Sequence, residues 1–136
     1  MTTVFDVAYF ILSYEGEMTA LKLIKLCYYS YVWHLVWENK PLFPESILAT
    51  KLGAVIPELY DLLKGKFKVS KEDILQHNQL TADEETNIII VLDAYKQWTA
   101  QQLTEINKQE DPWKIAIKSI DNKITDSLII EYYSSL

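Results

Sequence analysis

The sequence contains no arginine: all 13 of its basic residues are lysine, against 19 acidic residues, and the formal net charge is −6. Arginine alone carries the planar guanidinium group that clamps phosphate or reads guanine through two parallel hydrogen bonds. An acidic chain also repels nucleic acid unless a local basic patch overrides its overall field. The composition therefore argues against nucleic acid as a partner.

Glycine and cysteine are also scarce. Three glycines are too few for a phosphate-cradling loop or for a large sheet of hairpins. The single cysteine, Cys27, excludes an internal disulfide, and residues 1–12 lack the basic start and the small-residue cleavage site of a signal peptide. These absences predict a cytoplasmic protein in a reducing compartment.

The length is that of one ordinary domain. A chain of 136 residues buries about two-thirds of its unfolded surface on folding, so its core needs neither a metal nor a disulfide. No internal repeat, low-complexity segment or linker divides the sequence. We therefore expect residues 1–136 to form a single domain.

The stretch from Thr19 to Asn39 is predicted to be one helix, around which the rest of the chain is organised. From Leu26 to Trp37 only Ser30 and His34 interrupt an apolar and aromatic run. A helix that is hydrophobic nearly all round is normally buried among other helices. The run is shorter than the roughly 20 residues that a bilayer requires, and lysines lie within the helix, so a membrane span is not expected.

One side of this helix is aromatic. In helical projection, Lys22 and Lys25 fall on the same side as Tyr29, Trp33 and Val36. The lysines predict that this side meets water. Its aromatic half is then either covered by another helix of the chain or left open as a partner-binding surface. If it is covered, the partner surface should lie in the proline-rich segment that follows the helix.

Capping patterns predict further helices on both sides of the central one. A serine or threonine followed three residues later by an acid or a glutamine marks helix starts at Thr3, Ser70, Thr81 and Thr99. A threonine cap is also expected at Thr19, and the short connection before it predicts that the first two helices pack as antiparallel neighbours.

The remaining segments are less regular. Residues 39–60 carry three of the four prolines and leave room only for a short extended piece near Ile47–Thr50. The lysine-rich segment 64–71 is expected to be a solvated loop or a short strand. The alternative is that it binds an acidic segment of a partner. The predicted fold is therefore mainly all-α: a compact multi-helix domain around a central hydrophobic helix, with a proline-rich loop and room for a small β-hairpin.

No catalytic pattern is present. Cys27 and His34 lie two helical turns apart, about 10 Å, which is too far for a nucleophile and its base, and a zinc site would need further ligands. The acid pairs Glu84–Glu85 and Glu110–Asp111 fall at predicted helix ends, where acids normally cap the helix or complement its dipole. We therefore expect no catalytic, cofactor or metal site, and no enzyme.

Several short motifs, in order along the chain, resemble the Panacea domain of the SocA-like antitoxin family. The central helix carries the most telling motif, MTALKLIKLCYY from Met18 to Tyr29, which is similar to the family's pattern of spaced leucines and lysines before a tyrosine. The other matching stretches are Pro41-Leu42-Phe43, Glu45 to Ala49, Gly53 to Pro57, Leu59-Tyr60, Asp111-Pro112-Trp113 with Ala116, and Tyr132-Tyr133.

The resemblance implies an antitoxin of a bacterial or phage toxin–antitoxin system that neutralises a co-encoded toxin by direct binding. In the SocA-like branch it implies instead an adaptor that delivers the toxin to an energy-dependent cellular protease. The acidic net charge would complement the charge of a basic toxin. Assembly of the chain into a homo-oligomer is compatible with either mechanism. The rival interpretations are a small enzyme or nucleotide-binding protein of unknown chemistry, and a transcriptional regulator, against which the lack of arginine argues.

Two positions depart from the family pattern. Ala54 stands where proline is usual, and Ile106-Asn107 stands where a pair that ends in histidine is common. The aromatic helix side and the ordered motifs together provide the candidate partner-binding residues, because aromatic side chains are typical interface anchors. These candidates are Lys22, Lys25, Tyr29, Trp33, Pro41, Phe43 and Tyr60.

Overall fold

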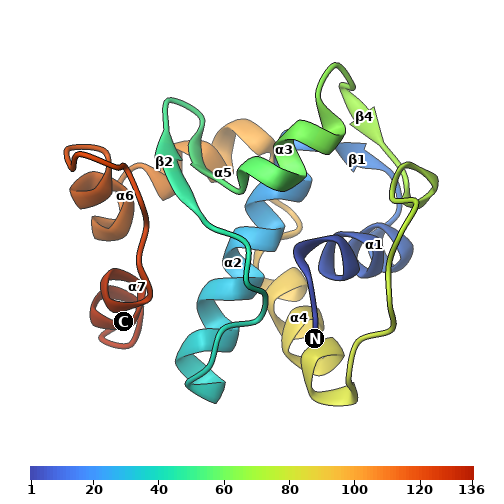
Figure 1. Ribbon diagram of the computed structural model, residues 1–136, viewed down its shortest axis with the longest axis horizontal. Helices are drawn as coiled ribbons and strands as arrows, with labels where there is room; N and C mark the ends of the chain where they lie inside the picture. The colour runs from blue at the N-terminus through green and yellow to red at the C-terminus, as the bar shows by residue number, and fades with distance from the viewer.

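The computed structural model describes all residues, 1–136, and confirms a mainly α-helical fold with small two-stranded sheets (Figure 1). The helices are α1 (Val4–Glu15), α2 (Ala20–Glu38), α3 (Pro57–Leu63), α4 (Ala82–Tyr95), α5 (Ala100–Asn107), α6 (Asp111–Ala116), α7 (Asp126–Tyr133) and a short 3-10 helix (Lys71–Asp73). The strands are β1 (Met18–Thr19), β2 (Leu48–Thr50), β3 (Gly53–Val55) and β4 (Lys68–Val69).

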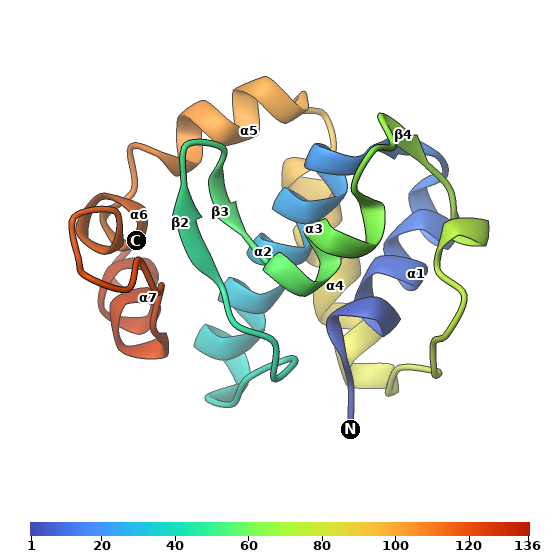
Figure 2. The same ribbon diagram turned by 45° about the horizontal axis from the view of Figure 1, so that its top comes forward.

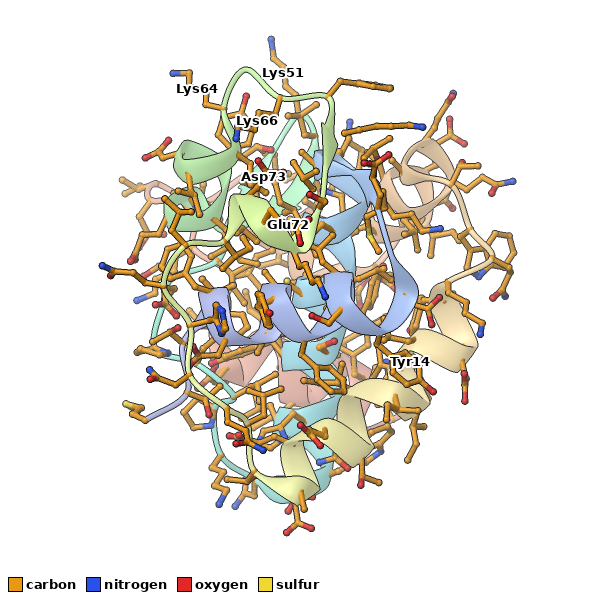
Figure 3. All side chains as sticks on the ribbon, turned by 90° about the vertical axis from the view of Figure 1, so that its right-hand side faces the viewer. Tyr14, Lys51, Lys64, Lys66, Glu72 and Asp73 are labelled. Atoms are coloured by element: carbon orange, nitrogen blue, oxygen red, sulfur yellow. The ribbon has the colours of Figure 1, made fainter.

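Helix α2 is the centre of the fold, as the sequence predicts. Every residue from Leu23 to Val32 is buried, and helices α1, α3, α4, α5 and α7 all pack against it. Figure 2 shows α2 passing through the middle of the molecule, with α4 and α7 on its two sides. The predicted antiparallel packing of the first two helices is wrong, because α1 crosses α2 (Figure 3).

Threonine caps begin the long helices, which confirms the capping predictions. The side chains of Thr3, Thr19, Thr81 and Thr99 each accept a hydrogen bond from the backbone N–H three residues on. These bonds satisfy backbone donors that have no partner within the helix. The similar pattern at Ser70 begins only the short 3-10 helix.

The predicted hairpin forms in the proline-rich region. Strands β2 and β3 pair antiparallel, with Ala49 opposite Ala54 and Thr50 opposite Gly53. A second pair was not predicted: β1, just before α2, pairs with β4, which lies in the lysine-rich segment. This pair brings residues 64–71 beside the start of α2, although about 50 positions of sequence separate them.

The core is one contiguous cluster of 33 buried apolar residues contributed by every α-helix. Its centre is the run of leucine, isoleucine and tyrosine side chains on α2. No helix is both long enough and apolar enough to cross a bilayer.

Candidate partner-binding site

Lys25 ties α2 to the hairpin. Its side chain is fully buried, and its ammonium nitrogen donates hydrogen bonds to the backbone oxygens of Leu52 and of Ala54, the latter at 2.8 Å. Burial, helped by the positive charge of Lys108, lowers the pKa of Lys25 from 10.5 to about 7. The prediction that this lysine marks a solvent-facing side is therefore wrong, because the hairpin covers it.

Asn107, at the end of α5, holds the other side of the hairpin. The side-chain oxygen of Asn107, Oδ1, accepts a hydrogen bond from the backbone N–H of Ala54 at 2.5 Å. Gly53 leaves room for this contact: a Cβ atom at Gly53 would lie 2.6 Å from the Asn107 oxygen and 3.1 Å from the Lys25 side chain. Gly53 also has a φ of +86°, which L-residues with a side chain rarely adopt. The hairpin turn is thus closely fitted to α2 and α5.

Glu110 is the charged centre of this buried network. One of its carboxylate oxygens accepts hydrogen bonds from the hydroxyls of Tyr29 and Tyr133, both at 2.7 Å, and from the Asn107 amide at 3.4 Å. The Tyr28 hydroxyl lies 3.0 Å from that of Tyr133. Burial raises the pKa of Glu110, against the opposing effect of these donors.

The role expected for Glu110 is wrong in one respect. The residue precedes α6, but its side chain makes no capping hydrogen bond and is turned into the core. Two tyrosine hydroxyls meet it there, so the carboxylate joins α2 to α7 across the region between α5 and α6. The network therefore holds α2 and α7 in place relative to the start of α6.

Other helices cover most of the aromatic side of α2. Tyr29 is fully buried and stacks on Tyr95 of α4, with ring centres 4.3 Å apart. Trp33 is half-buried, and its indole N–H donates to the Tyr95 hydroxyl at 3.0 Å. Tyr133 of α7 closes the same region at 5.7 Å from the Trp33 ring. Of the two alternatives, the one in which the chain covers its own aromatic side holds for Tyr29.

The other predicted site residues are spread over the molecule. Phe43 is buried against Tyr31, with ring centres 4.8 Å apart. Lys22 is half-buried near the start of α2 and donates to the backbone oxygen of Lys96 at 2.5 Å. Pro41 is exposed in the loop after α2. A partner that docks on the folded chain therefore reaches Lys22, Trp33 and Pro41, but not Lys25, Tyr29 or Phe43.

Tyr60, the last predicted residue, lies in an open groove of about 850 Å³ between the start of α2, the end of α3 with the loop after it, and α5. Three large apolar side chains in its lining stay exposed: Leu52 at 41%, Tyr60 at 38% and Phe67 at 77%. A smaller pocket of about 440 Å³, beside β2 and α3, shares Leu52 and Tyr60. Exposed apolar side chains that gather in one concavity commonly mark a binding site. We call the larger concavity the α3–α5 groove.

Lysines surround the α3–α5 groove. Lys64, Lys66 and Lys108 line it, and Lys51 lines the smaller pocket beside it. Figure 3 shows Lys51, Lys64 and Lys66 gathered at one end of the molecule, around the hairpin turn and the loop after α3. The acidic chain therefore carries a local basic rim at this end.

The cysteine and the histidine of α2 take up structural positions. Cys27 is fully buried, and burial raises the pKa of its thiol. The Nδ1 atom of His34 lies 3.3 Å from the Asn87 amide nitrogen, and burial lowers the pKa of His34. No group of three or more histidine, cysteine or acidic side chains is arranged to hold a metal ion.

Comparison with known families places the chain. The family model described as antitoxin SocA-like, Panacea domain, matches residues 23–114, which is more than half of the sequence. The chain belongs to this antitoxin family. No curated protein and no solved structure matches it. The matched segment runs from within α2 to within α6, and it includes the hairpin, Glu110 and most of the α3–α5 groove.

The two departures from the family pattern contact each other in this Panacea domain. The backbone N–H that Ala54 donates to Asn107 is one that proline does not have. An asparagine at position 107 thus finds its partner because position 54 is not proline. In the hairpin, Ala54 lies opposite Ala49, and its N–H is free to point toward α5.

Sequence reasoning missed Leu52, Phe67, Asn107 and Glu110. Two of them carried a usable signal: Leu52 falls in the hairpin turn, and Phe67 lies between two lysines, which are both places where a large apolar side chain stays exposed. Asn107 stood out as a departure from the family pattern and Glu110 as one of an acid pair, but the sequence could not show the partners Ala54 and Tyr29, which lie 53 and 81 positions away.

Proposed function

We propose that this Panacea domain acts as an antitoxin by direct binding: residues 1–136 form one domain that occupies a surface of a co-encoded toxin and neutralises it without catalysis. Membership of the SocA-like antitoxin family supports this proposal most strongly, since an antitoxin family implies a toxin partner. The cytoplasm, where toxin and antitoxin are both made, is the proposed compartment.

The α3–α5 groove is the proposed contact surface. Burial removes Lys25, Tyr29 and Phe43 from direct contact, and Tyr60 is the candidate that stands beside other exposed apolar side chains. A contiguous apolar surface of this kind provides the anchors that dominate binding energy in protein interfaces. Lys22, Trp33 and Pro41 are proposed as secondary contacts.

Co-expression with the product of the adjacent gene tests the function. We expect that product to arrest growth when expressed alone, and growth to resume when the wild-type Panacea domain is present. A harmless neighbour, or one that stays toxic beside the wild-type domain, contradicts the proposal.

The same assay locates the surface and separates two mechanisms. Tyr60→Ala should weaken rescue, whereas Tyr14→Ala, which removes from α1 a tyrosine that is 51% exposed against 38% for Tyr60, should not. Rescue should persist in cells that lack their energy-dependent proteases. If rescue is lost in those cells while the two proteins still bind, the domain is an adaptor for proteolysis.

A further inference from the structure

The α3–α5 groove has an unusual combination of chemistry for this chain. Apolar side chains of α2 and α3 line it, and the exposed side chains of Leu52, Tyr60 and Phe67 belong to the same lining. Three lysines line it against a single acid, Glu105. The protein as a whole has a net charge of −6, so the sign of the charge is reversed locally at this groove.

The lysines at the rim differ in whether an acidic side chain of the same chain pairs with them. Lys66 is paired with Asp73 at 2.5 Å, so a large part of its charge is neutralised. Lys64 is exposed and forms no ion pair. Lys108 also lacks a carboxylate partner, and its ammonium group lies 5.5 Å above the Trp113 ring. The groove therefore offers two lysines, Lys64 and Lys108, that form no ion pair with an acid of this chain.

The hairpin turn adds one further cation. Lys51 is exposed and forms no ion pair, and it lines the smaller pocket that shares Leu52 and Tyr60 with the groove. One acid, Asp61, lines the same pocket. Figure 3 shows the Lys51 and Lys64 side chains projecting from the same end of the molecule. They bracket the apolar lining from the hairpin on one side and from the end of α3 on the other.

We infer that the α3–α5 groove binds an acidic segment of the toxin, whose apolar side chains contact Leu52, Tyr60 and Phe67 while its carboxylates meet Lys51 and Lys64. This inference rests on the proposed function and adds the chemistry of the partner to it. Complementary charge at the rim of an apolar contact provides specificity and speeds association. The apolar lining and the lack of arginine favour a peptide over nucleic acid, whose phosphates would leave the apolar side chains unmatched.

Binding measurements with defined probes test the inference. Fluorescein-labelled, overlapping peptides that cover the product of the adjacent gene are titrated with the wild-type domain, and the anisotropy of the label is followed. We expect the peptides that bind to be acidic and to contain apolar residues, with affinity that falls as salt is added. A labelled single-stranded oligonucleotide serves as the nucleic-acid probe and should not bind.

Two variants and a matched control locate the contact. Lys51→Glu with Lys64→Glu should weaken binding of the acidic peptide about tenfold, because attraction to two carboxylates becomes repulsion. Lys40→Glu with Lys118→Glu makes the same change in net charge at two exposed lysines outside the groove, and should alter binding less than about twofold. Phe67→Ala removes an apolar contact that is 77% exposed, and should also weaken binding about tenfold while leaving the fold intact.

Each outcome bears on one of the two proposals. If the groove pair and the control pair bind alike, or if the tightest peptides are basic, or if the oligonucleotide competes for the groove, the inference is overturned. It is also overturned if no peptide binds. If acidic peptides bind in the groove but the wild-type domain fails to rescue growth, the inference stands and the neutralisation proposal fails.

Discussion

Replacing Lys25 with methionine tests whether the buried amine controls how the stability of this Panacea domain depends on pH. The amine is fully buried and makes hydrogen bonds only to the backbone oxygens of Leu52 and Ala54. Its pKa is about 7 in the folded chain, against 10.5 as the ordinary value. Methionine keeps a stem of similar length and cannot titrate.

The sign of the effect follows from proton binding. Below about pH 7 the amine is charged in both states, so Lys25 adds no slope. Between about pH 7 and 10.5 the unfolded chain binds more protons than the folded chain, so the free energy of unfolding rises with pH. Over the roughly two pH units above neutrality we expect a rise of about 2 kcal/mol.

Urea denaturation at a series of pH values measures this rise. The wild-type domain should gain about 2 kcal/mol between about pH 7 and pH 9, and Lys25→Met should lack that gain. Cys27 contributes the opposite slope near the upper end, because burial raises the pKa of its thiol, but it does so in both proteins. The difference between the two profiles therefore isolates Lys25. Parallel profiles would refute the reasoning.

Four further substitutions test the buried network by chemical denaturation. Gly53→Ala should destabilise by about 2–3 kcal/mol, because a φ of +86° is strained for alanine and the added Cβ displaces Asn107. Ala54→Pro should lower the free energy of unfolding by about 1–3 kcal/mol, because it removes the backbone N–H that donates to the Asn107 side chain. The double variant with Asn107→His should lose less stability than the sum of the two single losses. Simple additivity would show that the two positions are not coupled. Burial raises the pKa of Glu110, so the folded wild-type domain takes up this proton before the unfolded chain does and gains stability as the pH falls from neutrality toward the ordinary pKa of glutamate. Glu110→Gln should abolish that gain. An acid profile that matches the wild type would contradict this reasoning.

Much of the fold was predictable because its signals are local. A threonine cap needs only the backbone N–H three residues on, and the apolar run of α2 is continuous in sequence. The hairpin was predictable as a short extended piece between proline and glycine. The β1–β4 pair was predictable only in part: segment 64–71 was expected to be a loop or a short strand, but the two residues of β1 carry too little pattern to be recognised.

The site was less predictable than the fold. Helical projection correctly grouped Lys25, Tyr29 and Trp33 on one side of α2, but it cannot say what packs against that side. The hairpin covers Lys25, and α4 covers Tyr29. The exposed apolar surface lies instead in the α3–α5 groove at Tyr60. Among the candidates on α2, Lys25 and Tyr29 are buried, whereas Lys22 and Trp33 are half-buried.

By itself the sequence determined the helix starts, the central position of α2 and the family, because each rests on neighbouring residues or on motifs read in order. Only the tertiary structure decided which charges are buried. Glu110 meets Tyr29 across 81 positions of sequence and Lys25 meets Ala54 across 29, and the pKa of each charged group depends on these distant neighbours. The basic rim of the α3–α5 groove has the same origin, since β1–β4 pairing and the hairpin turn bring separate lysines to one end of an acidic molecule.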